Sequence, residues 1–322
     1  MKKHNTLLSA LPAWYYAREE TEFLARRLTE SAGQEKGIVG AVLFGPPGVG
    51  KTSFASALAE GWEAELITFV AHHWVSDELF IVALDPAWVG AMAGGLVDPS
   101  PGRAWRLGVL PTAAIASWLG RVVVLLDEWD KAPPPADVLL LEFLQEGTAR
   151  VPAVARDAVE RALSKAGIHS DCPEWIRPEG STIAIRANPS SLLVLLTSNE
   201  ERPLADPLLR RVRRLRMGFL PPEVEMQVLR KETGAPPGLC RGIVETLNRM
   251  RKYASDKGLS LPSLPEGIRL ARDLMAARSF EEARAAVEAN LARSQMDLAW
   301  LREADVASAL WGEVTRARRA SP

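Results

Sequence analysis

The sequence predicts an α/β fold, in which helices cover both faces of a parallel sheet, followed by a smaller domain made only of helices. Three observations lead to this prediction. Several short segments are apolar throughout, which is typical of strands buried on both faces of a sheet. The glycine-rich loop GPPGVGKT, residues 45–52, directly follows the first of these segments and precedes a helical pattern. After about residue 220 the strand pattern stops, and only helical patterns follow.

The elements of the first domain alternate as a parallel sheet requires. A mixed-charge amphipathic helix is expected first, at residues 14–30. The further helices are expected where a helical pattern ends at Gly61 and Gly147, because glycine is favoured just after a helix C-terminus. In chain order, the expected elements are strand 38–44, helix 52–60, strand 65–70, strand 121–126, helix 136–147 and strand 191–197.

Two connections are longer than the fold needs. About a dozen residues suffice for a crossover between parallel strands, yet residues 71–120 and 148–190 separate neighbouring predicted elements. Both stretches are therefore expected to carry inserted elements. The sequence predicts no role for residues 151–180 within the second insertion.

The C-terminal part begins after Phe219-Leu220-Pro221-Pro222, where the pattern changes. We therefore predict an α/β domain at residues 1–220 and a smaller helical domain, the lid, at residues 221–322. The expected helices of the lid lie at 222–234, 239–258, 265–279, 280–295 and 304–319.

Composition restricts the class of protein. The chain has 322 residues and a formal net charge of −1, so no overall field attracts it to nucleic acid or to a membrane surface. Its two cysteines, Cys172 and Cys240, form no CxxC or metal-binding spacing, which favours a reducing, cytoplasmic setting. The apolar stretch 79–97 is interrupted by Asp85-Pro86 and by two glycines, so a membrane span is not expected.

The glycine-rich loop has the chemistry of a phosphate-binding site. It fits the pattern G-x-x-x-x-G-K-S/T through Gly45, Pro46, Pro47, Gly48, Val49, Gly50, Lys51 and Thr52. Glycines allow successive backbone N–H groups to point at phosphate oxygens, and the N-terminus of the next helix favours the same anion. Lys51 can reach the outer phosphates, and the Thr52 hydroxyl can bind Mg²⁺. A chance match is the alternative, but the predicted strand and helix around the loop argue against it.

Two carboxylates follow the third strand. Asp127 and Glu128 come directly after the apolar segment RVVVLL, at the sheet edge where open α/β proteins bind ligands. Asp127 can contribute to a Mg²⁺ site, and Glu128 can orient or deprotonate an attacking water. A solvated acidic turn would be an equally good interpretation if the phosphate loop were absent.

These segments also carry a family resemblance. GPPGVGKT, VVVLLDEWDKAP and LLVLLTSNEERPLADPLLRRVRRL, in this order, resemble an AAA+ ATPase, most closely its MoxR and dynein-related (AAA_5-like) branch. Residues 105–132 and 139–152 are similar to the stretches around that branch's acidic motif. The resemblance covers residues 35–220 well and the C-terminal part loosely. Two features depart from it: Trp129 stands where a smaller apolar residue is usual, and residues 151–180 are longer than expected.

The resemblance implies further roles at matching positions. ATP and Mg²⁺ are implied as cofactors, and Ser53 joins the loop residues that bind the nucleotide. Asn199 matches the first sensor, a polar residue near the γ-phosphate. Arg211 matches the arginine finger that acts in trans on a neighbouring subunit, with Arg210 as the alternative if the register shifts by one. Arg269 resembles the second sensor, although an exposed helix arginine is an equally good interpretation.

The function implied by the resemblance is that of a hexameric ATPase ring with chaperone activity. Such proteins remodel or mature a client protein, often with a partner that carries a von Willebrand factor A domain, and loops of the two insertions would transmit the motion.

Two alternatives belong to other classes. The first is a nucleic-acid motor, such as the NTPase subunit of a restriction system, some of which prefer GTP. The arginines at 210, 211, 213, 214 and 216 favour it, whereas the nearly neutral charge and the lack of a helix-turn-helix signal count against it. The second is a non-hydrolysing nucleotide-binding scaffold, against which the intact set of Lys51, Asp127, Glu128 and Asn199 argues.

Overall fold

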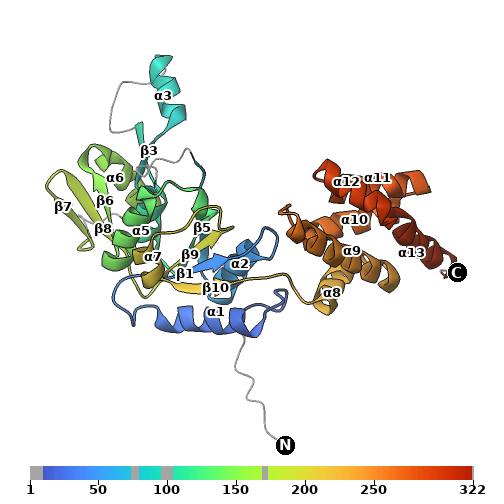
Figure 1. Ribbon diagram of the computed structural model, residues 1–322. Helices are drawn as coiled ribbons and strands as arrows, with labels where there is room; N and C mark the ends of the chain where they lie inside the picture. Colours follow the sequence, from blue (N-terminus) through green and yellow to red (C-terminus); the bar gives the residue numbers. More distant parts are fainter. Residues whose placement is uncertain (1–9, 74–79, 96–103, 169–172, 321–322) are drawn as a thin grey trace, which may run out of the picture. The chain divides into compact units, whose positions relative to one another are not determined.

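The computed structural model of the chain describes residues 10–73, 80–95, 104–168 and 173–320 (Figure 1). The chain forms two compact units. The α/β unit comprises Met1–Gly45 and Lys51–Arg216, and the helical unit comprises Pro46–Gly50 and Met217–Pro322. The division after Arg216 lies close to the domain boundary expected at residue 220.

A parallel sheet forms the centre of the α/β unit. Within the described residues it has five strands in the order β10-β1-β9-β5-β2, and every neighbouring pair is parallel. The strands are β1 (Val39–Phe44), β2 (Glu65–Val70), β5 (Val122–Asp127), β9 (Leu192–Ser198) and β10 (Arg213–Arg216). The predicted parallel α/β sheet is confirmed, and so are its four apolar strands. The fifth strand, β10, has the sequence RRLR and was not predicted.

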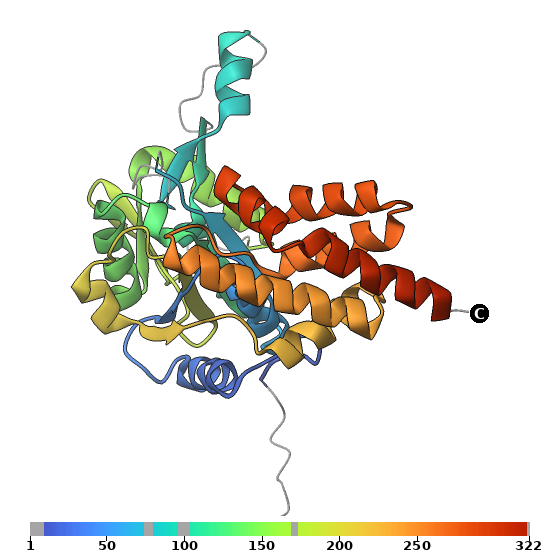
Figure 2. The ribbon, with the colours of Figure 1, turned by 45° about the vertical axis from the view of Figure 1, so that its right-hand side comes forward.

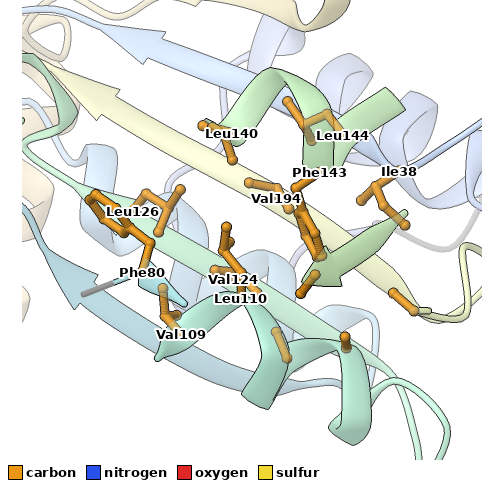
Figure 3. Close-up of a cluster of buried hydrophobic side chains, with 14 of the residues drawn as sticks. Ile38, Phe80, Val109, Leu110, Val124, Leu126, Leu140, Phe143, Leu144 and Val194 are labelled. Atoms are coloured by element: carbon orange, nitrogen blue, oxygen red, sulfur yellow. The ribbon is translucent and has the colours of Figure 1, made fainter. Parts of the chain in front are cut away.

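Helices flank this sheet. Their bounds are α1 (Glu19–Ser31), α2 (Lys51–Gly61), α4 (Val109–Ala116), α5 (Pro135–Glu146) and α7 (Asp206–Arg211). Figure 3 shows Leu140 and Phe143 of α5 beside Val194 of β9 in a cluster of buried side chains. Burying a side chain of this size contributes about 1.5–3 kcal/mol, so this packing holds the strand ends, and the residues that follow them, in fixed positions.

The first long connection carries a protruding hairpin. β3 (Val82–Leu84) pairs antiparallel with β4 (Trp105–Leu107), and α3 (Pro86–Ala93) lies between them in sequence. The Asp85 carboxylate caps α3 by accepting a hydrogen bond from the Ala87 N–H at 3.0 Å. Although its sequence, PAWVGAMA, is almost wholly apolar, α3 has no buried residue. In Figure 1 and again in Figure 2, α3 stands away from the central sheet.

The second long connection forms a small sheet of its own. It contains β6 (Thr148–Pro152), the short helix η4 (Ala153–Ala155), α6 (Arg156–Lys165), β7 (Ile176–Glu179) and β8 (Thr182–Arg186). The three strands are antiparallel in the order β6-β8-β7. Cys172, in the same connection, lies outside the described residues.

The helical unit follows β10. Its helices are α8 (Pro222–Thr233), α9 (Pro237–Asp256), α10 (Leu264–Ala276), α11 (Phe280–Leu291), α12 (Gln295–Glu303) and α13 (Val306–Ala320). The helix expected at 280–295 ends early, because Ser294 starts a new one: its hydroxyl accepts a hydrogen bond from the Asp297 N–H at 3.1 Å. Across the described ranges, no helix is both long and apolar enough to cross a bilayer.

Candidate active site

The glycine-rich loop connects β1 to α2. Gly45, Gly48 and Gly50 have φ angles of 148°, 78° and 94°, in a region that residues with a Cβ rarely adopt. The Gly45 N–H donates a hydrogen bond to the Ser198 carbonyl at 3.2 Å, which ties the start of the loop to the end of β9. Successive N–H groups in such a loop can face a bound anion, and α2 begins directly after it. The backbone therefore fits a phosphate group.

Lys51, the first residue of α2, lies at the ends of the strands. Its side chain is buried, and its Nζ donates to the Gly45 carbonyl at 2.5 Å and to Asn199 Oδ1 at 2.7 Å. Burial lowers the pKa of Lys51, and the nearby carboxylates, above all Asp130 and Asp127, act in the opposite direction. The structure thus brings together the predicted phosphate lysine and the predicted first sensor.

The two residues predicted to bind Mg²⁺ lie on α2 and β5. The Thr52 hydroxyl lies 3.3 Å from both oxygens of Asp127. Thr197 of β9 donates its own hydroxyl to Asp127 Oδ1 at 2.5 Å, which orients the carboxylate. Mg²⁺ prefers oxygen ligands, so Thr52 and Asp127 fit an ion that would offset charge on the phosphates. Ser53 is exposed in the first turn of α2.

Glu128 occupies a strained turn directly after β5. Its φ of 54° is left-handed, which for a residue other than glycine costs about 1–3 kcal/mol and persists only where neighbouring groups hold it. Here the Thr197 hydroxyl accepts a hydrogen bond from the Glu128 N–H at 2.8 Å. The carboxylate pairs with Lys131 Nζ at 2.8 Å, and this hydrogen bond raises the pKa of Lys131. The pair is partly exposed, so only a small free-energy cost opposes its separation.

Asp130, which the sequence pattern did not single out, holds the loop at residues 199–201 that follows β9. Its side chain is 2% exposed, and Oδ2 accepts hydrogen bonds from the N–H groups of Asn199 at 2.8 Å and Glu201 at 2.9 Å. These two donors converge because Glu200 between them has a left-handed φ of 66°. Within the described residues, Asp130 Oδ1 is buried without a partner. The third acidic residue in DEWD was the available signal, but a carboxylate so near a turn is usually solvated.

The two arginines at the end of α7 differ in their surroundings. Arg211 is half-buried, and its Nη2 donates to the carbonyls of Lys36 at 2.6 Å, Ile38 at 3.2 Å and Leu144 at 3.1 Å. Arg210 is exposed, and its side chain makes no hydrogen bond or ion pair to any residue that the structure describes. The role of Arg211 as the trans finger remains a prediction, but these contacts favour the alternative, Arg210.

The other arginines of this segment belong to the edge of the sheet. Arg213 donates to Ser31 Oγ at 2.8 Å and pairs with Glu35. Arg216 forms two hydrogen bonds with the Glu200 carboxylate, at 2.6 and 2.8 Å. The segment therefore does not present five unpaired cations to a nucleic acid. Arg269 is exposed on α10 in the helical unit, and its role as second sensor remains a prediction.

A family model matches the part of the chain that contains these site residues, Arg269 excepted. Residues 41–220 match the model of the ATPase family associated with various cellular activities (AAA), more than half of the chain. No curated protein matches the chain.

Among solved structures, the chain is similar in fold to a mutant of Thermotoga maritima RuvB, with a TM-score of 0.47 and 14% identity over 85% of this chain and 71% of that one. A second RuvB structure from the same organism, titled a Holliday junction branch migration motor, gives a TM-score of 0.45 and 15% identity over 85% of this chain and 69% of that one. The AAA domain of FIGL-1 in complex with ADP gives a TM-score of 0.39 and 18% identity over 83% of this chain and 71% of that one. Because the family match spans the β1 loop and the acidic and polar ends of β5 and β9, the chain belongs to the AAA family and is an ATPase.

Proposed function

We propose that this ATPase works as a ring of identical chains, a hexamer in its simplest form, in which Arg210 of one copy completes the active site of the next. The observation that carries the proposal is the contrast at the end of α7: Arg211 is held by three carbonyls, whereas Arg210 is exposed and unpaired within the described residues. An arginine that reaches the transferred phosphoryl group stabilises the charge that develops there. An exposed arginine beside the edge strand β10 is suited to supply that charge to another molecule.

Assembly can be tested through the dependence of turnover on protein concentration. The specific rate of ATP hydrolysis should rise as chains associate, because an isolated chain lacks the last cation of its site. The rate would be measured beside sedimentation of the same samples with ATP and Mg²⁺ present. A specific rate that stays constant, on protein that remains monomeric with ATP bound, would contradict the ring and the trans role together.

The proposed substrate is a client protein that the ATPase remodels, as MoxR-like chaperones do. The expected partner is a protein that carries a von Willebrand factor A domain. The proposed setting is the reducing cytoplasm. Support comes from the β3–α3–β4 hairpin, where Val89 is 42% exposed and α3 has no buried residue. Exposed apolar surface of this kind is typical of protein–protein contact.

The hairpin can be tested by replacing residues 82–107 with a short Gly-Ser linker. ATP turnover should persist, because the phosphate loop, the acidic turn and the sensor lie on other elements. A client that stays bound to Glu128→Gln protein should no longer be captured when the same protein carries the linker. If the linker protein loses ATP binding, the hairpin is a structural part of the α/β unit, and its proposed role in client contact is wrong.

A further inference from the structure

The helix that carries Arg210, α7, is too short to be stable without contacts from the rest of the α/β unit. α7 has six residues, and Leu208 is its buried residue. Helices shorter than about 12 residues are only marginally stable on their own, and no side chain of α7 caps its N-terminus. Contacts from outside the helix must therefore determine where Arg210 lies.

Asp137 of α5 supplies these contacts. It is 2% exposed, and its Oδ2 accepts a hydrogen bond at 2.8 Å from the N–H of Ala205, the N-cap residue of α7. Arg202, a few residues earlier, donates to both carboxylate oxygens, at 3.0 and 2.8 Å. Charge-assisted bonds with two parallel N–H groups fix direction as well as distance. One buried carboxylate thus holds both the start of α7 and the segment that leads into it.

The same carboxylate also holds the turn that carries Glu128. Trp129 is 1% exposed, and its indole Nε1 donates to Asp137 Oδ1 at 2.8 Å. Arg202 donates in addition to the Ala132 carbonyl at 2.8 Å, just after the turn. A smaller apolar residue at position 129, which the family resemblance led us to expect, would lack the indole N–H that makes this connection.

We propose that Trp129, Asp137 and Arg202 form a positioning network that fixes α7 relative to the Glu128 turn and so sets where Arg210 is presented to a second copy of the chain. This inference rests on the proposed trans role of Arg210. The network joins the acidic turn of one active site to the arginine that serves another. None of its three members is required to touch nucleotide; each acts through Arg210.

Arg202→Lys tests the network with the charge retained. Lysine cannot reproduce the two-pronged contact with Asp137, so α7 should shift. A misplacement of about 1 Å can lower a rate by roughly 10²-fold, and we expect a fall of that size in kcat. ATP binding should be unchanged, because Lys51, Thr52 and the glycine loop are untouched.

Mixed assemblies separate a positioning role from a local one. Glu128→Gln protein has an inactive site but a well-placed Arg210, so adding it should raise the turnover per Arg202→Lys chain. Wild-type protein mixed in the same ratio measures any inhibition by inactive neighbours. Arg210→Ala protein, mixed in the same way, should also be rescued. If Arg210→Ala is rescued and Arg202→Lys is not, the network inference is wrong and the trans role stands; if neither is rescued, the trans role itself is wrong.

A matched control in the helical unit separates the effect of Arg202→Lys on stability from its effect on kcat. Arg251 forms a comparable buried pair with Glu225, at 2.9 and 2.8 Å, and also donates to a backbone carbonyl. Arg251→Lys should lower the melting temperature about as much as Arg202→Lys without giving a kcat defect that Glu128→Gln protein rescues. Should Arg202→Lys fail to fold, Trp129→Phe retains an aromatic ring but removes the indole donor together with part of the buried ring volume. It should show a smaller kcat loss with the same rescue, and an unrescued loss would overturn the proposal.

Discussion

Replacing Arg210 by alanine is expected to lower ATP turnover by about 10³–10⁵-fold, the range that arginine fingers contribute in phosphoryl transfer. The physical reason is that charge developing on the transferred phosphoryl group loses its last cation, while the ground state of bound ATP loses nothing. Nucleotide affinity should therefore stay close to that of the wild type. The measurement is steady-state hydrolysis under assembling conditions, together with equilibrium binding of a fluorescent ATP analogue.

The neighbouring arginine is the matched control for this experiment. Arg211→Ala removes the donor of three hydrogen bonds to backbone carbonyls. A typical hydrogen bond contributes about 0.5–1.5 kcal/mol to the free energy of unfolding, and the Leu144 carbonyl keeps a second donor, the Ile38 N–H. Arg211→Ala should thus unfold at lower urea concentration and retain turnover below that midpoint. The opposite pattern, a stable Arg211→Ala protein without turnover beside an active Arg210→Ala protein, would return the finger to Arg211.

Replacing Glu128 by glutamine is the second large effect that we expect. Removal of a positioned general base typically costs about 10²–10⁴-fold in rate, and glutamine retains the shape of the side chain. ATP should still bind, because the contacts of Lys51 and the Thr52–Asp127 pair do not involve Glu128. The expected result is a protein that binds ATP and accumulates it unhydrolysed, seen by rapid separation of bound nucleotide and its identification as ATP or ADP.

Two further variants distinguish loss of hydrolysis from loss of nucleotide binding and from loss of the Glu128 ion pair. Lys51→Ala should lose nucleotide binding itself, since its ammonium is the cation beside the glycine loop. Lys131→Met removes the partner that pairs with the Glu128 carboxylate in this structure but leaves Glu128 in place, so hydrolysis should persist. Equal turnover by wild-type and Glu128→Gln proteins would show that another group orients the water.

The elements that the sequence predicted well are those whose patterns are local. β2 has the predicted bounds, β1 starts one residue later than predicted, and β5 and β9 are each shifted by one residue at both ends. β1, β5 and β9 are almost wholly buried, which leaves an uninterrupted apolar run in the sequence. The strand β10 escaped prediction because its burial is incomplete: its arginines are accommodated by Glu35 and Glu200, which are distant in sequence. Charge that would argue against a strand is neutralised by residues that the local pattern does not reveal.

The same distinction applies to the candidate site: residues in local sequence patterns could be predicted, and residues whose roles depend on distant contacts could not. Lys51, Thr52, Asp127 and Glu128 could be selected because glycine spacing and strand ends are visible in the sequence. Asp130 and Asp137 could not, because their roles depend on backbone N–H groups near residues 199–205. The choice between Arg210 and Arg211 also needed the structure, since a six-residue helix places adjacent side chains in different surroundings.

The order of the strands has a consequence for how the chain folds during its synthesis. β1 lies between β9 and β10, and Val39 pairs with Leu193 while Ala41 pairs with Arg213. The strand before the phosphate loop is thus made early but gains its neighbours only when much of the chain has left the ribosome. Pairings between residues so distant in sequence form slowly, and an apolar strand with open edges is exposed to aggregation in the meantime. A nascent chain that stopped before β9 would leave β1 without either partner. We therefore expect the phosphate loop to be among the last parts of the α/β unit to become ordered.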